Sequence, residues 1–207
     1  MRPLFIALIT LGGLAQSSLA HIVLAEPKAP AGAYYKATLR VGHGCNGAAT
    51  TGLAVTLPPG FQGAKPQPKT GWTLTTQKAK LAQPYTSHGK LITEDVVQLQ
   101  WMAQNQTSAL ADDAFDEFAF LVRLPQEAGA VWLRVLQMCE GGQTDWSEVP
   151  ATGTSTRGLK APAALLMITP PPGHEAHASE PAKPAVPAAK APASHPHHHP
   201  PAPSHSH

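Results

Sequence analysis

Prolines and short runs of β-forming residues alternate along the chain from about residue 21 to residue 170. Runs rich in Val, Leu, Thr, Phe or Trp occur in HIVLAEP, AYYKATLRVGHGC, TTGLAVTLPPG, GWTLTTQKA, EDVVQLQWMA, DEFAFLVRLP, GAVWLRVLQMC and TDWSEV. Prolines at positions 58, 59, 66, 68, 84, 125 and 150 punctuate them, and no stretch keeps a helical period. About eight short strands at this spacing predict an all-β fold, an antiparallel β-sandwich. A helical turn is expected at most within TSALADDAFDEFAF.

The first twenty residues, MRPLFIALITLGGLAQSSLA, have the pattern of a secretory signal. One positive charge at Arg2 precedes an apolar run that is shorter than the ~20 residues needed to span a membrane. Small residues at Ser18 and Ala20 form the cleavage pattern. We therefore expect cleavage after Ala20, export to the periplasm, no membrane span in the mature chain, and His21 as its first residue.

The tail, residues 171–207, differs sharply from the domain expected over 21–170, because it is rich in Pro and Ala and has almost no large apolar residues. Such a segment cannot bury enough surface to offset its ordering entropy, so we expect a disordered arm. Imidazoles in a flexible chain bind copper, zinc or nickel. The tail lacks the uninterrupted run of six histidines of a purification tag, and we interpret it as a metal-collecting arm through His174, His177, His195, His197, His198, His199, His205 and His207.

Charge, cysteines and motifs narrow the function classes. The formal net charge of +2 at pH 7 gives no reason to expect nucleic acid or anionic lipid as a partner. Cys45 and Cys139 are the only cysteines. In an oxidising compartment they are expected to join, two free buried thiols being the alternative. The chain contains no G-x-S-x-G, P-loop, H-E-x-x-H or glycine-rich nucleotide motif, so no enzyme activity is expected.

An N-terminal histidine offers two metal ligands, because its free α-amine and its ring Nδ1 can chelate one ion. Nitrogen donors of this kind suit Cu(II) best among the divalent first-row metals. Cleavage before His21 would create such a ligand. After loss of the signal segment the methionines are Met102, Met138 and Met167, and they are not expected to form a thioether cluster for Cu(I).

A carboxylate would complete the ligand set, and the acidic side chains cluster in ALADDAFDEF. If FDEFAF is a strand, Phe118 and Phe120 face the core and Glu117 faces the other way. A solvated acidic loop with an outward glutamate is the simpler interpretation. Other candidates are less favourable: Glu26 points away from His21 in an extended segment, and His43 and His88 are expected in loops, His43 near the cysteine pair.

Four segments together resemble the YcnI-like copper-binding domain family of exported bacterial proteins. They are HIVLAEPKAPAGAYYKATLRVGHGCNGAATTGLAVTLPPG, KPQPKTGWTL, DAFDEFAFLVRLP and VLQMCEGGQTDW, and the resemblance runs from His21 to about Val149 without the tail. It implies an Ig-like or cupredoxin-like β-sandwich. It also implies a Cu(II) site built on one mature N-terminal histidine, a carboxylate near the DEF strand and a neighbouring tryptophan.

Carried over to this chain, the resemblance implies His21 as the histidine, Glu117 as the first choice of carboxylate and Asp112 as the second. Trp146 is preferred to Trp132 as the tryptophan beside the metal. The resemblance also supports a disulfide between the two cysteines, because both lie in the matching segments.

We therefore expect a periplasmic Cu(II) chaperone or store for copper homeostasis or cuproenzyme maturation. Its partners would be the copper ion and another periplasmic copper protein or a membrane copper transporter. Two alternatives stay open. A redox enzyme could use the same histidine with His43 or His88 as a second one, or the chain could be an interaction module whose tail buffers metal.

Overall fold

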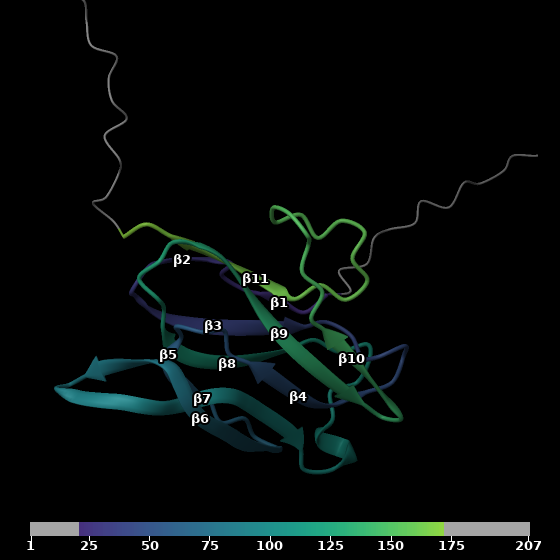
Figure 1. Ribbon diagram of the computed structural model, residues 1–207. Helices are drawn as coiled ribbons and strands as arrows, with labels where there is room; N and C mark the ends of the chain where they lie inside the picture. Colours follow the sequence, from purple (N-terminus) through teal and green to yellow (C-terminus); the bar gives the residue numbers. More distant parts are fainter. Residues whose placement is uncertain (1–20, 172–207) are drawn as a thin grey trace, which may run out of the picture. The chain divides into compact units, whose positions relative to one another are not determined.

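The computed structural model describes residues 21–171, which fold into two facing β-sheets (Figure 1). The smaller sheet has the strand order β1-β3-β8-β5 and is antiparallel throughout. Its strands are β1 (Val23–Leu24), β3 (Tyr34–Val41), β8 (Asp116–Arg123) and β5 (Gln62–Pro66).

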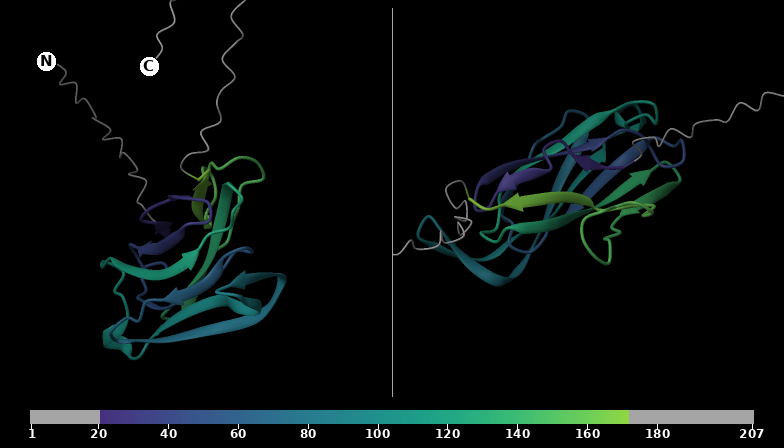
Figure 2. Two further views of the ribbon diagram at one scale, coloured as in Figure 1. Left: turned by 90° about the vertical axis from the view of Figure 1, so that its left-hand side faces the viewer. Right: turned by 90° about the horizontal axis from the view of Figure 1, so that it is seen from above.

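The larger sheet has the order β2-β11-β9-β4-β7-β6. Its strands are β2 (Lys28–Pro30), β11 (Ala164–Thr169), β9 (Gly129–Cys139), β4 (Thr50–Thr56), β7 (Lys90–Ala103) and β6 (Trp72–Ser87). A further strand, β10 (Gly142–Trp146), pairs with the second half of β9, whereas β11 pairs with the first half. The predicted all-β sandwich is confirmed, with one departure from antiparallel pairing: β2 and β11 are parallel, side by side in Figure 2.

The core forms between the two sheets because buried and exposed residues alternate along the strands. In β8, Phe118 and Phe120 are buried and Glu117 is exposed, as the alternation predicts. Trp101 and Trp72 pack edge-on against Phe118, with ring centroids 5.8 and 5.0 Å away. These aromatic side chains therefore anchor the centre of the sandwich.

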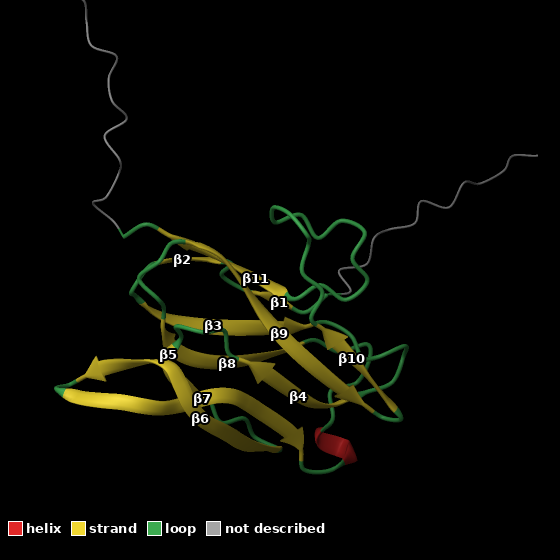
Figure 3. Ribbon diagram, viewed as in Figure 1, coloured by secondary structure: helices red, strands yellow, loops and turns green. Residues whose placement is uncertain are grey.

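The hairpin of β6 and β7 is longer than the sequence predicts, and its tip projects beyond the neighbouring strands (Figure 3). Pro84 was expected to end a strand, but it lies inside β6, in an irregular stretch between Lys80 and Tyr85 where the register shifts. Because β6 is an edge strand, a residue without a backbone N–H is tolerated there. Asp95 accepts a hydrogen bond from Tyr85 Oη within the hairpin at 2.6 Å and one from Gly63 N of β5 at 2.7 Å, which ties the hairpin to the smaller sheet.

A 3-10 turn, Gln106–Ser108, overlaps only the first two residues of the segment with possible helical character, and the rest of that segment is not helical (red element in Figure 3). Asn105 caps it by accepting a hydrogen bond from Ser108 N. Beyond it, Leu110 is buried and its backbone exchanges two hydrogen bonds with Thr50. The chain after this turn is therefore fixed to the start of β4, and this places the acidic loop that follows.

Candidate functional site

His21 and Trp146 meet at the edge of the sandwich, where β1 begins and β10 ends. Their ring centroids lie 5.8 Å apart in an edge-to-face arrangement. His21 is half-buried, and the next residue, Ile22, is buried in the core and anchors the start of the segment. The indole of Trp146 is itself almost fully buried. It therefore forms a rigid apolar wall beside the histidine.

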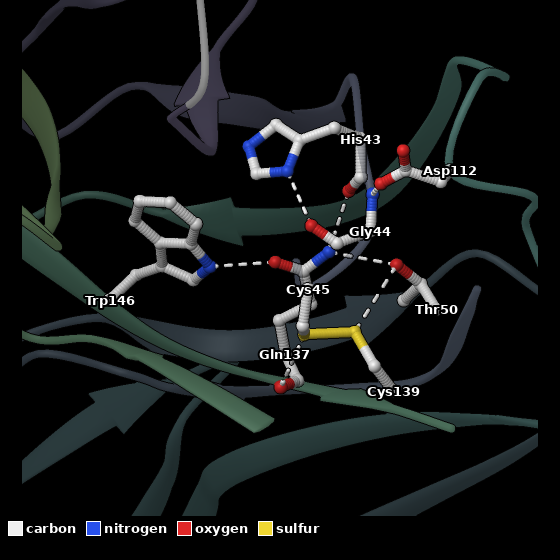
Figure 4. The surroundings of a disulfide bond; sticks show 8 residues. All are labelled: His43, Gly44, Cys45, Thr50, Asp112, Gln137, Cys139 and Trp146. Carbon is white, nitrogen blue, oxygen red and sulfur yellow. Dashed lines mark hydrogen bonds between the residues drawn. A yellow bond between two sulfur atoms is a disulfide. The ribbon is translucent and has the colours of Figure 1, made fainter. Parts of the chain in front are cut away.

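Trp146 is fixed by a buried hydrogen-bond network (Figure 4). Its Nε1 donates to Gln137 Oε1 at 2.9 Å. The other end of the same amide, Gln137 Nε2, donates to the backbone oxygen of His43 and to Thr50 Oγ1, both at 2.8 Å. Gln137 is fully buried, so each of these bonds satisfies a polar group that has no access to water.

The loop between β3 and β4 brings a second histidine to the same tryptophan. The His43 ring lies edge-on to Trp146, with centroids 5.9 Å apart, and its Nδ1 also contacts the oxygen of Gly44. Gly44 is required here, because a Cβ would lie 1.7 Å from the oxygen of Ala48. Two imidazoles thus flank one indole, a feature that the expectation of a loop histidine near the disulfide did not include.

The Cys45–Cys139 disulfide closes this end of the domain. It joins the loop that follows β3 of the smaller sheet to the last residue of β9 in the larger sheet. Thr50 Oγ1 lies 3.9 Å from Cys139 Sγ, so the disulfide borders the network around Gln137 (Figure 4). The predicted disulfide is confirmed, and it fixes the loop that carries His43.

The two candidate carboxylates lie in different surroundings. Asp112 Oδ1 accepts a hydrogen bond from Gly44 N at 2.9 Å, so it lies against the loop that contacts Trp146. Glu117 forms an exposed ion pair with Arg40 at 3.0 Å, on the outer face of the smaller sheet. In register, Arg40 lies between Val23 of β1 and Glu117 of β8. Within residues 21–171, no three or more His, Cys, Asp or Glu side chains are grouped so as to bind a metal ion.

Other residues considered from the sequence lie elsewhere. Trp132 of β9 lies opposite Leu165 of β11 and is half-buried. His88 is exposed in the tight turn between β6 and β7, as expected. Glu26 accepts a hydrogen bond from Tyr35 Oη through its backbone oxygen, and burial, followed by the charge of Glu26, raises the pKa of Tyr35 to about 12.

Some expectations fall on residues 1–20 and 172–207, which lie outside the described part of the chain. They include the signal segment, the disordered arm and all the tail histidines. Over residues 21–171, none of the helical structure is long and apolar enough to cross a membrane.

Sequence reasoning missed Gln137, although a signal for it exists. It occupies an inward position in β9, in the series Leu133, Val135, Gln137 and Cys139, where the alternation calls for an apolar residue. A polar residue at such a position indicates a buried hydrogen-bond network.

Comparisons with known proteins agree with this fold. A solved structure described as an uncharacterized protein from Nocardia farcinica with an immunoglobulin-like fold matches with a TM-score of 0.56 and 25% identity. The match covers 72% of this chain and 98% of that one. No curated protein matches the chain. The model of a family described as a domain of unknown function, DUF1775, matches residues 21–168. This range includes His21, His43, Trp146 and the disulfide. The chain belongs to this family.

Proposed function

We propose that this protein is an exported Cu(II)-binding protein of the YcnI-like group, acting as a periplasmic copper chaperone or store. The observation that carries the proposal is the contact between His21 and the buried indole of Trp146. The match to the family model also begins at His21, directly after the segment with the signal pattern. Copper is the cargo in this proposal, and the chain performs no reaction on it.

The donor set fits Cu(II). Cleavage after Ala20 would free the α-amine of His21, so that one residue supplies two nitrogen ligands, and both must be deprotonated to bind. Trp146 would exclude water from one side of such a site. The network through Gln137 supports this role, because it fixes the orientation of the indole before any ion arrives.

The carboxylate ligand is either Asp112 or Glu117. Asp112 is supported by its hydrogen bond to Gly44, in the loop that contacts the same tryptophan. To bind copper, Glu117 would have to leave its exposed ion pair with Arg40, and losing that pair costs only about 0–1 kcal/mol of stability. Partners in delivery would be another periplasmic copper protein or a membrane copper transporter, and the tail histidines would collect metal.

The first experiment is mass spectrometry of the exported protein, which should find His21 as the first residue. Cu(II) affinity is then measured on a chain that starts at His21 and ends at Pro171, and on the same chain with Ala-Ala-Ala-Ala added before His21. The shortened chain is a suitable subject, because the family model matches residues 21–168 and the solved structure is matched over 98% of its own length. The extension should weaken the tightest site at least about tenfold, since it moves the α-amine out of chelating reach of the His21 ring. Equal affinity in the two chains would refute the proposal.

Two further variants assign the carboxylate. Asp112→Asn preserves an oxygen acceptor for Gly44 N, and Glu117→Gln preserves the size of the side chain. The variant that weakens Cu(II) binding while the nitrogen couplings in electron paramagnetic resonance stay unchanged identifies the ligand. His88→Ala is the matched control, because this histidine is exposed in a distant turn and should have no effect.

A second candidate function is a copper-dependent redox enzyme, and one observation favours it. His43 lies beside the same indole as His21, which gives the site a second imidazole of the kind that oxygen-activating copper centres use. Electron paramagnetic resonance separates the two functions. Two coordinated nitrogens support the chaperone or store, and three nitrogens that fall to two in His43→Ala support the enzyme.

A further inference from the structure

Two methionines from distant parts of the sequence converge on the outer face of the larger sheet. Gly52 of β4 lies opposite Met102 of β7 on one side and opposite Met138 of β9 on the other. The three strands are adjacent in Figure 1. No thioether cluster for Cu(I) is expected from the sequence, but Met102 and Met138 lie next to each other over Gly52.

The glycine between them creates the space that both thioethers occupy. A Cβ built on Gly52 would lie 2.6 Å from Met102 Sδ and 2.7 Å from Met138 Cε. Any other residue at this position would push the two side chains apart. Both methionines are half-buried, so they cover the glycine and still reach solvent.

The amide nitrogen of Gln100 lies close to both sulfur atoms. Gln100 Nε2 donates to Met102 Sδ at 3.2 Å and lies 3.9 Å from Met138 Sδ as a second acceptor. The amide has two N–H donors, so one nitrogen atom lies within hydrogen-bonding distance of both sulfurs. A cation in the place of this nitrogen would lie close to both sulfur atoms, and Gln100 is half-buried.

We infer that Met102 and Met138 form a binding site for a soft monovalent cation, Cu(I). Thioether sulfur selects Cu(I) over harder ions, and unbranched methionine side chains can adjust to the ion. The site does not depend on His21. Met138 and Gln137 are neighbours in β9 and face opposite sides of the sheet, so the thioethers and Trp146 lie on different faces.

The test is a titration of the full chain, labelled with carbon-13 at the methionine methyl groups, with Ag(I) as a stable substitute for Cu(I). The methyl resonances of Met102 and Met138 should shift together and saturate at one equivalent for this site. Met167 lies on β11, away from the pair, and its resonance is the internal control. Mg(II), which favours oxygen ligands, should leave all of them unchanged. Methionine resonances that do not respond to Ag(I), while silver binds elsewhere in the chain, would overturn the inference.

Variants give an independent readout. The double variant Met102→Leu and Met138→Leu retains side-chain volume and removes both sulfurs. Ag(I) affinity at this site should fall at least about tenfold, whereas Met167→Leu should have no effect. An unchanged affinity in the double variant would contradict the site. Separately, the methionine shifts should persist when Ala-Ala-Ala-Ala precedes His21, and their loss there would contradict the independence of the two sites.

Discussion

Gln137 and Met138 are consecutive residues of β9 that face two different environments. Gln137 points into the sandwich, is fully buried, and joins Trp146, His43 and Thr50 through three hydrogen bonds. Met138 points outward, is half-buried, and shares the space over Gly52 with Met102. One strand thus contributes a rigid polar group to one face and an adaptable sulfur to the other.

The difference follows from how each side chain is satisfied. A buried amide leaves orphaned donors or acceptors behind when a partner is lost, so its geometry is fixed by several segments at once. A thioether requires no hydrogen bond and tolerates rearrangement. The inner face is therefore suited to holding Trp146 beside His21, and the outer face can rearrange around an ion.

The disulfide should give the largest effect on the inner face. In the double variant Cys45→Ala and Cys139→Ala, the free energy of unfolding should fall by about 4 kcal/mol, because the disulfide closes a long loop between residues 94 positions apart. Urea denaturation measures the change, and the reduced natural chain is the control. A loss below about 1 kcal/mol would mean that the Gln137 network fixes this end of the domain without the disulfide.

Gln137→Leu should give the second-largest loss in the free energy of unfolding. The substitution leaves Trp146 Nε1, Thr50 Oγ1 and the His43 oxygen without their buried partner, and the expected loss is about 3 kcal/mol by urea denaturation. Gln143→Leu is the matched control, because Gln143 is exposed opposite Met138 and should change stability by less than about 0.5 kcal/mol. Similar losses in the two variants would remove the distinction between the buried and exposed amides.

The sequence predicts which side chains lie on the inner face of the sheet better than it predicts the contacts on the outer face. Alternation in β8 and β9 reveals which side chains are buried, and the cysteine pair follows from the compartment and the family resemblance. Alternation cannot reveal that β4 separates β7 from β9, because strand order depends on long-range packing. The meeting of Met102 and Met138 over Gly52 depends on that order, as does the approach of His43 to Trp146.

Gly52→Ala tests the crowding on the outer face. The new methyl group would overlap Met102 Sδ and Met138 Cε, but both belong to flexible side chains that can move, so the expected cost is about 1–2 kcal/mol. A double-mutant cycle with Met102→Ala isolates the contact: the cost of Gly52→Ala should shrink when the sulfur is absent. An unchanged cost would place its origin in the backbone of β4 rather than in the thioethers.

Met138→Leu should have the smallest effect on stability, below about 1 kcal/mol, because the swap conserves volume and orphans no polar group. The comparison with Gln137→Leu is the sharpest one available, since the two positions are adjacent in β9 and receive the same new residue. Both are measured by urea denaturation under identical conditions. If the loss at position 138 equals that at 137, the outer face is as tightly constrained as the inner one. It would then lack the freedom to rearrange around a cation. A small loss combined with weaker Ag(I) binding would separate the sulfur's role in binding from its role in packing.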